Sequence, residues 1–146
     1  MTINSHAIVV TQHPHVTQGR QVAFLAPMLH YLMMERPACG SGWQVKIKAL
    51  ILTPTRELAL QIGVEILRLT HGSEIKTNML YGGTSVKHMW GNFLVLDEAD
   101  QMLDLGFSAY IDIILNSAHN GYRRTLMFSA TFPANVKEMA AKYLEA

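Results

Sequence analysis

The stretch IKALILTPTRELALQIGVEILRL, Ile47 to Leu69, contains the pattern that decides the fold. Its first part, Ile47 to Leu52, is a short apolar run of the kind that forms a buried strand. Thr53 can cap a helix that begins at Pro54, because its hydroxyl can accept a bond from the first turn and proline suits the first helical position. Further apolar residues recur at helical spacing, at Leu58, Ile62, Ile66 and Leu69. The stretch therefore predicts a strand followed directly by a helix.

Two further stretches repeat this order of strand and helix. In NFLVLDEADQMLDLGFSAYIDIIL, an apolar strand from Asn92 to Leu96 precedes a helical pattern. In RRTLMFSATFPANVKEMAAKYLEA, the strand core is Leu126 to Phe128, and Pro133 opens a helix. One face of that helix is apolar, with Val136, Met139, Ala140 and Tyr143. This alternation is typical of an α/β fold of three layers, with a mainly parallel sheet and helices on both of its faces.

Length and composition bound the class of protein. A chain of 146 residues, 49% of them hydrophobic, can bury one ordinary core, so we predict one domain over residues 1–146. The net charge of +1 excludes a general basic coat for nucleic acid and leaves local contacts through main-chain groups. The single Cys39 cannot form an internal disulfide, and we see neither a membrane span nor a secretory leader. We therefore expect an intracellular protein, in the cytoplasm or the nucleus.

Three carboxylates, Asp97, Glu98 and Asp100, follow the apolar strand that ends at Leu96. In open parallel sheets, ligands collect outside the carboxyl ends of the strands. An acidic residue at that edge can hold Mg²⁺ through water, and a second carboxylate beside it can orient or deprotonate an attacking water. The simpler interpretation is an acidic first turn that complements the helix dipole.

The motifs VLDEAD, PTRELA, YGG and FSATFP occur here in the order found in DEAD-box RNA helicases, and the Vasa-like branch is most similar. The resemblance covers nearly the whole chain and implies the first of that family's two RecA-like domains, with ATP and Mg²⁺ as cofactors. It implies that Asp97 binds Mg²⁺ through water and that Glu98 positions and activates the attacking water. Asp100 would pair with Ser129 and Thr131, linking the nucleotide site to closure of the two lobes. These two hydroxyls can also cap the helix that follows them.

The resemblance also implies contacts with RNA. One matching segment contacts RNA phosphates in the family and consists here of Pro54, Thr55, Arg56 and Glu57. The N–H groups of a helix N-terminus suit such phosphates. Gly82 and Gly83 match a second backbone-contacting motif, where missing side chains let a strand approach, and a plain turn is the alternative. Contacts of this kind read the backbone, so we expect RNA binding that does not depend on base sequence.

The sequence departs from the family at the nucleotide site. No glycine is followed by lysine, so the phosphate-binding loop G-x-x-x-x-G-K-[ST] is absent. In the family, the residues GR belong to the strand before that loop. Here GRQV (Gly19 to Val22) runs directly into Ala23, at the place where the loop belongs. After Gly83 only residues 84–91 precede the next strand, which is too few for a crossover between parallel strands. Asn4 stands near the family's adenine-reading glutamine, and its spacing to Gly19 is longer than usual.

Two interpretations of these gaps remain open. If loops near residues 22/23 and 84–92 are omitted from the sequence, the resemblance predicts an ATP-dependent RNA helicase, in which hydrolysis is coupled to RNA binding and local duplex unwinding. A second lobe, absent here, would then supply the arginines that stabilise the transferred phosphate, so the isolated lobe is expected to be nearly inactive. If the gaps are real, the chain is a catalytically inactive RNA-binding or scaffolding module.

Overall fold

The computed structural model describes residues 9–11, 17–35, 47–80, 92–117 and 124–144, with side chains from Gln21 onward. Asn4, Gly82 and Gly83 lie outside these residues. The chain divides into two compact units, and each is described by itself. The first unit contains the described residues 9–11, 47–54, 92–117 and 124–144, and the second contains residues 17–35 and 55–80. The prediction of a single domain over residues 1–146 stays a prediction.

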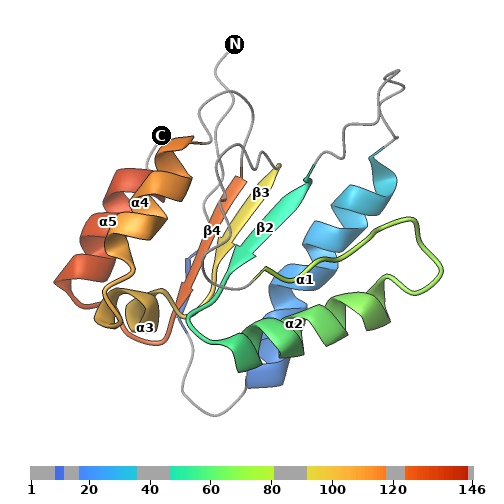
Figure 1. Ribbon diagram of the computed structural model, residues 1–146, viewed down its shortest axis with the longest axis horizontal. Coiled ribbons are helices and arrows are strands. Elements are labelled where there is room, and N and C mark those ends of the chain that lie inside the picture. Colours follow the sequence, from blue (N-terminus) through green and yellow to red (C-terminus); the bar gives the residue numbers. More distant parts are fainter. Residues whose placement is uncertain (1–8, 12–16, 36–46, 81–91, 118–123, 145–146) are drawn as a thin grey trace. The chain divides into compact units, whose positions relative to one another are not determined.

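A four-stranded parallel sheet forms the centre of the first unit (Figure 1). Its strands are β1 (Val9–Thr11), β2 (Ala49–Leu52), β3 (Phe93–Leu96) and β4 (Arg124–Ser129), in the order β1-β4-β3-β2. Strand β3 is buried along its whole length and pairs on both sides, with β2 and with β4. Leu96 is level with the last residue of β2 and with Met127 of β4, so these strands end at one edge. The short strand β1 was not predicted from the sequence.

Three helices complete the first unit, namely α3 (Ala99–Asp104), α4 (Ser108–Ser117) and α5 (Ala134–Leu144). Their buried side chains meet those of the sheet in one core. The predicted face of α5 is confirmed, because Val136 and Met139 are buried and Ala140 and Tyr143 pack against the core. The whole core cluster contains Leu94, Leu96, Ala99, Met102, Ile111, Leu115, Met127, Val136 and Met139.

The second unit contains two helices that pack against each other, α1 (Thr17–Met34) and α2 (Arg56–Leu69). Helix α1 runs without a break through Val22 and Ala23. The resemblance implies a strand at the start of GRQV, and this prediction is wrong because Gly19 lies inside the helix. The physical reason is the spacing of the buried residues, which recur at helical intervals across the join, at Gln21, Phe24, Leu25, Met28 and Leu29.

Helix α2 begins two residues later than predicted. Its N-cap is Thr55, whose backbone is extended (φ −126°, ψ 154°) and whose side chain accepts a bond from Leu58 N. Thr53 is therefore not the cap. This start places Glu57 in the first turn, where its charge complements the helix dipole. Leu58, Ile62 and Ile66 are buried as predicted, whereas Leu69, the last helical residue, is exposed.

The predicted α/β class with a parallel sheet is confirmed by this order of strands and helices. Within the ranges that the structure describes, no helix combines the length and the apolar character needed to cross a membrane.

Candidate functional site

Asp97 stands directly after β3, at the carboxyl edge of the sheet. Its side chain is fully buried. Its backbone N–H donates to Leu52 O across 3.0 Å, which extends the pairing of β3 with β2 by one residue. Its Oδ1 accepts a bond from Glu98 N at 3.1 Å. Sheet pairing therefore determines where this carboxylate lies.

Glu98 forms the N-cap of α3 in the left-handed conformation, with φ 58° and ψ 52°. Among the described residues it alone has a positive φ without being a glycine. This conformation costs a non-glycine residue about 1–2 kcal/mol, and such strain is concentrated at functional sites. The side chain makes no capping bond to the helix. The bend at Glu98 turns the chain from β3 into α3 and is held by the bond from Met102 N to Glu98 O, at 3.1 Å.

Asp100 joins the first turn of α3 to the end of β4. Its Oδ2 accepts bonds from Thr131 N at 2.9 Å and from Thr131 Oγ1 at 2.7 Å. In the other direction, Asp100 N donates to Ser129 Oγ at 3.1 Å, and Ser129 Oγ donates to Thr131 O at 2.7 Å. The structure thus brings together three of the residues that the sequence singled out, although Asp100 and Thr131 are far apart along the chain.

These bonds also bear on the alternative that the two hydroxyls cap α5. Ser129 Oγ instead accepts from a first-turn N–H of α3, the helix whose own N-cap side chain makes no such bond. A sequence pattern cannot show a cap supplied from another strand. Burial raises the pKa of the Asp100 carboxyl, but hydrogen bonds, chiefly those from Thr131, outweigh it and hold that pKa below its ordinary value of 3.8. Asp100 is therefore ionised at neutral pH.

The predicted phosphate-binding segment lies at the start of α2. Thr55 Oγ1 accepts from Leu58 N at 3.2 Å, and Thr55 O accepts from Ala59 N at 3.2 Å. Arg56 and Glu57 are the first two helical residues, and Pro54 precedes the cap. A helix N-terminus of this kind offers backbone N–H groups and a partial positive charge to an anion. The structure describes Pro54 to Glu57, whereas Gly82 and Gly83 lie outside the described residues.

The donor set for a metal ion is small. Among the residues that the structure describes, no group of three or more His, Cys, Asp or Glu side chains is arranged to hold a metal ion. The carboxylates of Asp97 and Glu98 are hard oxygen donors, the type that Mg²⁺ prefers, but two are too few for a cage made by the protein alone.

A family model described as DEAD/DEAH box helicase matches the chain in two pieces, residues 15–93 and 90–139. The ATP-dependent RNA helicase ddx46 of Dictyostelium discoideum is 36% identical over 160 residues, which covers 86% of this chain and 14% of the relative. The ATP-dependent RNA helicase vasa of Drosophila melanogaster is 33% identical over 158 residues, which covers 87% of this chain and 23% of the relative. Both alignments are longer than the chain itself, so the relatives carry residues that have no counterpart here.

Solved structures show the same likeness. A DEAD box protein from Methanococcus jannaschii matches with a TM-score of 0.75 and 29% identity, over 95% of this chain and 43% of that one. The yeast DEAD-box splicing factor Prp28 matches with a TM-score of 0.78 and 28% identity, over 97% of this chain and 40% of that one. The fold is therefore RecA-like, and the chain spans less than a quarter of the length of the two curated relatives. The chain belongs to the DEAD/DEAH box helicase family.

Proposed function

We propose that this chain is the first RecA-like lobe of an ATP-dependent RNA helicase and that it binds the sugar-phosphate backbone of RNA without reading base sequence. The observation that carries the proposal is the set of bonds between Asp100 and the pair Ser129 and Thr131. These bonds connect the DEAD and SAT segments at the carboxyl edge of the sheet, where ligands of parallel sheets collect. A lobe built in this way couples the two segments mechanically, because a shift of one changes the hydrogen bonds of the other.

The RNA contacts in this proposal are Pro54, Thr55, Arg56 and Glu57, together with Gly82 and Gly83. Support comes from α2, whose capped N-terminus presents backbone N–H groups and the cation of Arg56 at one end of the helix. None of these groups recognises a base edge by its chemistry, so the affinity is expected to be similar for different sequences. Such local contacts are compatible with a net charge of only +1.

ATP and Mg²⁺ belong to the proposal as cofactors of the complete helicase. The carboxylates of Asp97 and Glu98 fit Mg²⁺ by donor type, with Asp97 acting through water and Glu98 beside it. The chain does not fit the phosphates of ATP, because no glycine precedes a lysine and α1 continues unbroken through Val22 and Ala23. We therefore assign no hydrolytic step to these residues alone. Asn4, the proposed adenine contact, belongs to the same nucleotide site, which lacks its phosphate-binding loop.

Residues missing from the sequence near positions 22/23 and 84–92 would resolve this disagreement. Two observations support their loss, namely the alignments that are longer than the chain and the family model that matches in two pieces meeting at residues 90–93. Peptide mapping of the protein isolated from its source tests the point. Extra residues found between Val22 and Ala23 would support missing segments and ATP turnover. A peptide that runs directly from Val22 into Ala23 would favour the second candidate.

The second candidate is a catalytically inactive RNA-binding or scaffolding module derived from a helicase lobe. The continuous helix α1 favours it, because a helix in place of the phosphate loop leaves no cradle for a triphosphate. Both candidates include RNA as a partner, and only the first requires a second RecA-like lobe elsewhere in the protein. Both also place the protein inside the cell, in the cytoplasm or the nucleus, which the lone Cys39 supports.

RNA binding by the purified chain tests what the two candidates share. Fluorescence anisotropy with labelled single strands of uridine and of adenosine should give similar affinities. Replacing Arg56 by Ala should weaken the binding of both strands equally. It should also make the slope of log affinity against log salt less steep by about 0.7, the effect of one phosphate contact on a single strand. Arg68→Ala is the matched control, because it removes the same charge from the opposite end of α2. An equal effect of both substitutions, or a strong preference for one sequence, would refute backbone recognition at this helix end.

ATP turnover by the isolated chain tests the account of the nucleotide site that both candidates share. The isolated chain should show negligible RNA-stimulated hydrolysis in either case, because it lacks both the phosphate loop and the arginines that a second lobe supplies. Robust unwinding by these 146 residues would overturn this account of the site.

A further inference from the structure

An exposed apolar patch lies where α3 passes into α4, and the site described above does not use it. Its members are Leu105, Phe107, Tyr110 and Ile113, with exposed fractions of 54%, 37%, 68% and 54%. We call these residues the α3–α4 patch. Single exposed apolar side chains are ordinary on a protein surface, but several gathered in one short segment indicate an interaction site.

The turn that carries the first half of this patch is well defined. Gly106 has a positive φ of 79°, and its N–H donates to Leu103 O at 2.9 Å. Phe107 N donates to Met102 O at 3.0 Å. These two bonds end α3 and set the direction in which Leu105 and Phe107 leave it.

The second half of the patch lies on α4. Tyr110 and Ile113 are three residues apart and therefore share one face of the helix. Ile111 and Leu115 point the opposite way, into the core of the first unit. The exposed apolar face of α4 is thus a second apolar face, additional to the one that the fold requires.

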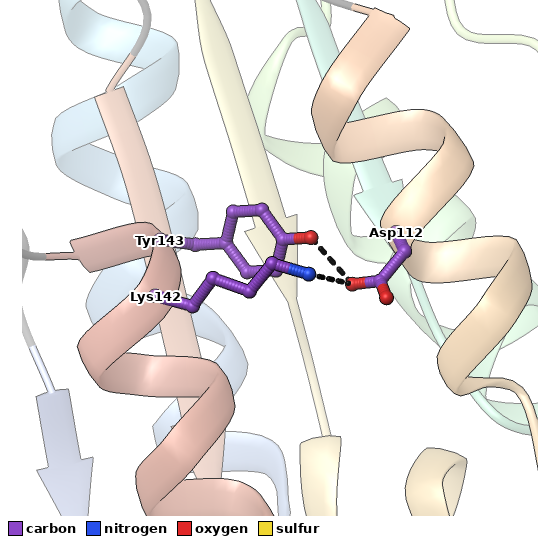
Figure 2. Close-up of polar contacts among 3 residues, drawn as sticks. All are labelled: Asp112, Lys142 and Tyr143. Carbon is purple, nitrogen blue, oxygen red and sulfur yellow. Dashed lines mark hydrogen bonds and ion pairs between the residues drawn. The ribbon is translucent and has the colours of Figure 1, made fainter.

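Helix α4 is tied to α5 through Asp112 (Figure 2). Lys142 Nζ donates to Asp112 Oδ1 at 3.2 Å, and the hydroxyl of Tyr143 donates to the same oxygen. The bond from Tyr143 and, to a lesser degree, the ammonium of Lys142 hold the pKa of the Asp112 carboxyl below its ordinary value. The patch is therefore presented by a helix with defined contacts, and the charge of Asp112 is already matched by a lysine.

The charge around the patch restricts its occupant. The segment Ala99–Ser117 has three aspartates and no Lys, Arg or His. Asp100 accepts bonds from Thr131 and Asp112 pairs with Lys142, which leaves the charge of Asp104. Asp104 is exposed and adjoins Leu105. The charge of Asp104 disfavours RNA phosphates and anionic lipid headgroups at this place. Two copies of the chain meeting symmetrically through the patch would bring like aspartates together, which is also unfavourable.

We infer that the α3–α4 patch is a docking site for a protein partner that presents an amphipathic helix, with apolar anchors flanked by lysine or arginine. Apolar anchors at helical spacing match the side-by-side placement of Tyr110 and Ile113. The basic flanks complement Asp104. Tyrosine at the centre of such a contact is typical of residues that dominate binding energy. The partner acts independently of the RNA and nucleotide contacts proposed above.

Two synthetic helical peptides test this inference on the whole chain. They share the same leucine anchors and differ only in flanking residues, lysine in one and glutamate in the other. Fluorescence anisotropy should show the lysine peptide binding at least about tenfold more tightly. Tyr110→Ser and Ile113→Ser should each weaken it by about tenfold or more. Val64→Ser is the matched control, since Val64 on α2 is 56% exposed and lies outside the patch, and circular dichroism melting checks that each variant folds.

A charge exchange gives a readout that altered folding cannot imitate. Asp104→Lys should reverse the preference, so that the glutamate peptide binds more tightly than the lysine peptide. Equal binding of both peptides to the parent chain, or an equal loss with Val64→Ser, would overturn the inference. Other occupants would overturn it as well. Such occupants would be shown by self-association in sedimentation, by flotation with phosphatidylserine vesicles or by binding of labelled poly(U), in each case only if Tyr110→Ser abolishes the signal.

Discussion

The left-handed backbone of Glu98 predicts that a variant with glycine at this position is more stable than a variant with alanine. The two substitutions to compare are Glu98→Gly and Glu98→Ala. Both delete the carboxylate and all of its contacts. They differ only in the Cβ atom, which disfavours a φ of 58°. The difference between the two variants therefore isolates backbone strain from side-chain interactions.

The size of the effect follows from that conformation. A left-handed residue other than glycine costs about 1–2 kcal/mol, and the greater freedom of glycine in the unfolded chain offsets about 0.5–1 kcal/mol. Glu98→Gly should therefore exceed Glu98→Ala in free energy of unfolding by about 1 kcal/mol. For a chain of this length the midpoint of thermal unfolding should rise by about 3 °C.

Urea unfolding followed by far-ultraviolet circular dichroism measures this difference directly. The control is the same pair of substitutions at Gln101, an exposed position inside α3, where alanine should be the more stable residue by about 1 kcal/mol. If Glu98→Ala proves as stable as Glu98→Gly, then Glu98 does not hold a strained backbone. The idea that strain is stored beside Asp97 would then be refuted.

Three further predictions concern the hydrogen bonds and packing of the described residues. Asp100 has a lowered pKa, so its contribution to the free energy of unfolding is complete above the ordinary value of 3.8 and is lost as the pH falls below that value. Asp100→Asn should flatten this part of the stability profile in urea titrations, and an unchanged profile would contradict the prediction. Thr55→Ala should lower the free energy of unfolding by about 1 kcal/mol while Thr55→Ser retains most of it, and equal losses would show that the cap bond to α2 contributes little. Gly63→Ala gains about 1 kcal/mol of helix propensity but places a Cβ 2.9 Å from the flexible Met79 Sδ, so the net change should be within about 0.5 kcal/mol. The full gain should appear in a Met79→Ala background, and a loss above about 2 kcal/mol in the parent would mean that Met79 cannot move.

The alternation of strands and helices could be read from the sequence because it depends on local spacing. Val136 and Met139 recur with the period of a helix, and Phe93 to Leu96 form an unbroken apolar run, so each segment specifies its own type. The boundary at Thr53 was predicted wrongly because two threonines flank Pro54 and both can cap a helix. Only the observed bond from Leu58 N distinguishes them. Strand β1 escaped prediction because a segment as short as Val9–Thr11 carries too few residues for a period.

The sequence by itself determined the fold class, the family motifs and the absence of a glycine–lysine phosphate loop, since each depends on residue types at short separations. The tertiary structure decided which of the candidate polar groups meet. Asp100 reaches Thr131 only because β3 and β4 are parallel neighbours that end at the same edge. The left-handed turn at Glu98 and the exposed second face of α4 were also decided there, because both depend on how the chain enters a helix and on which of its sides the core covers.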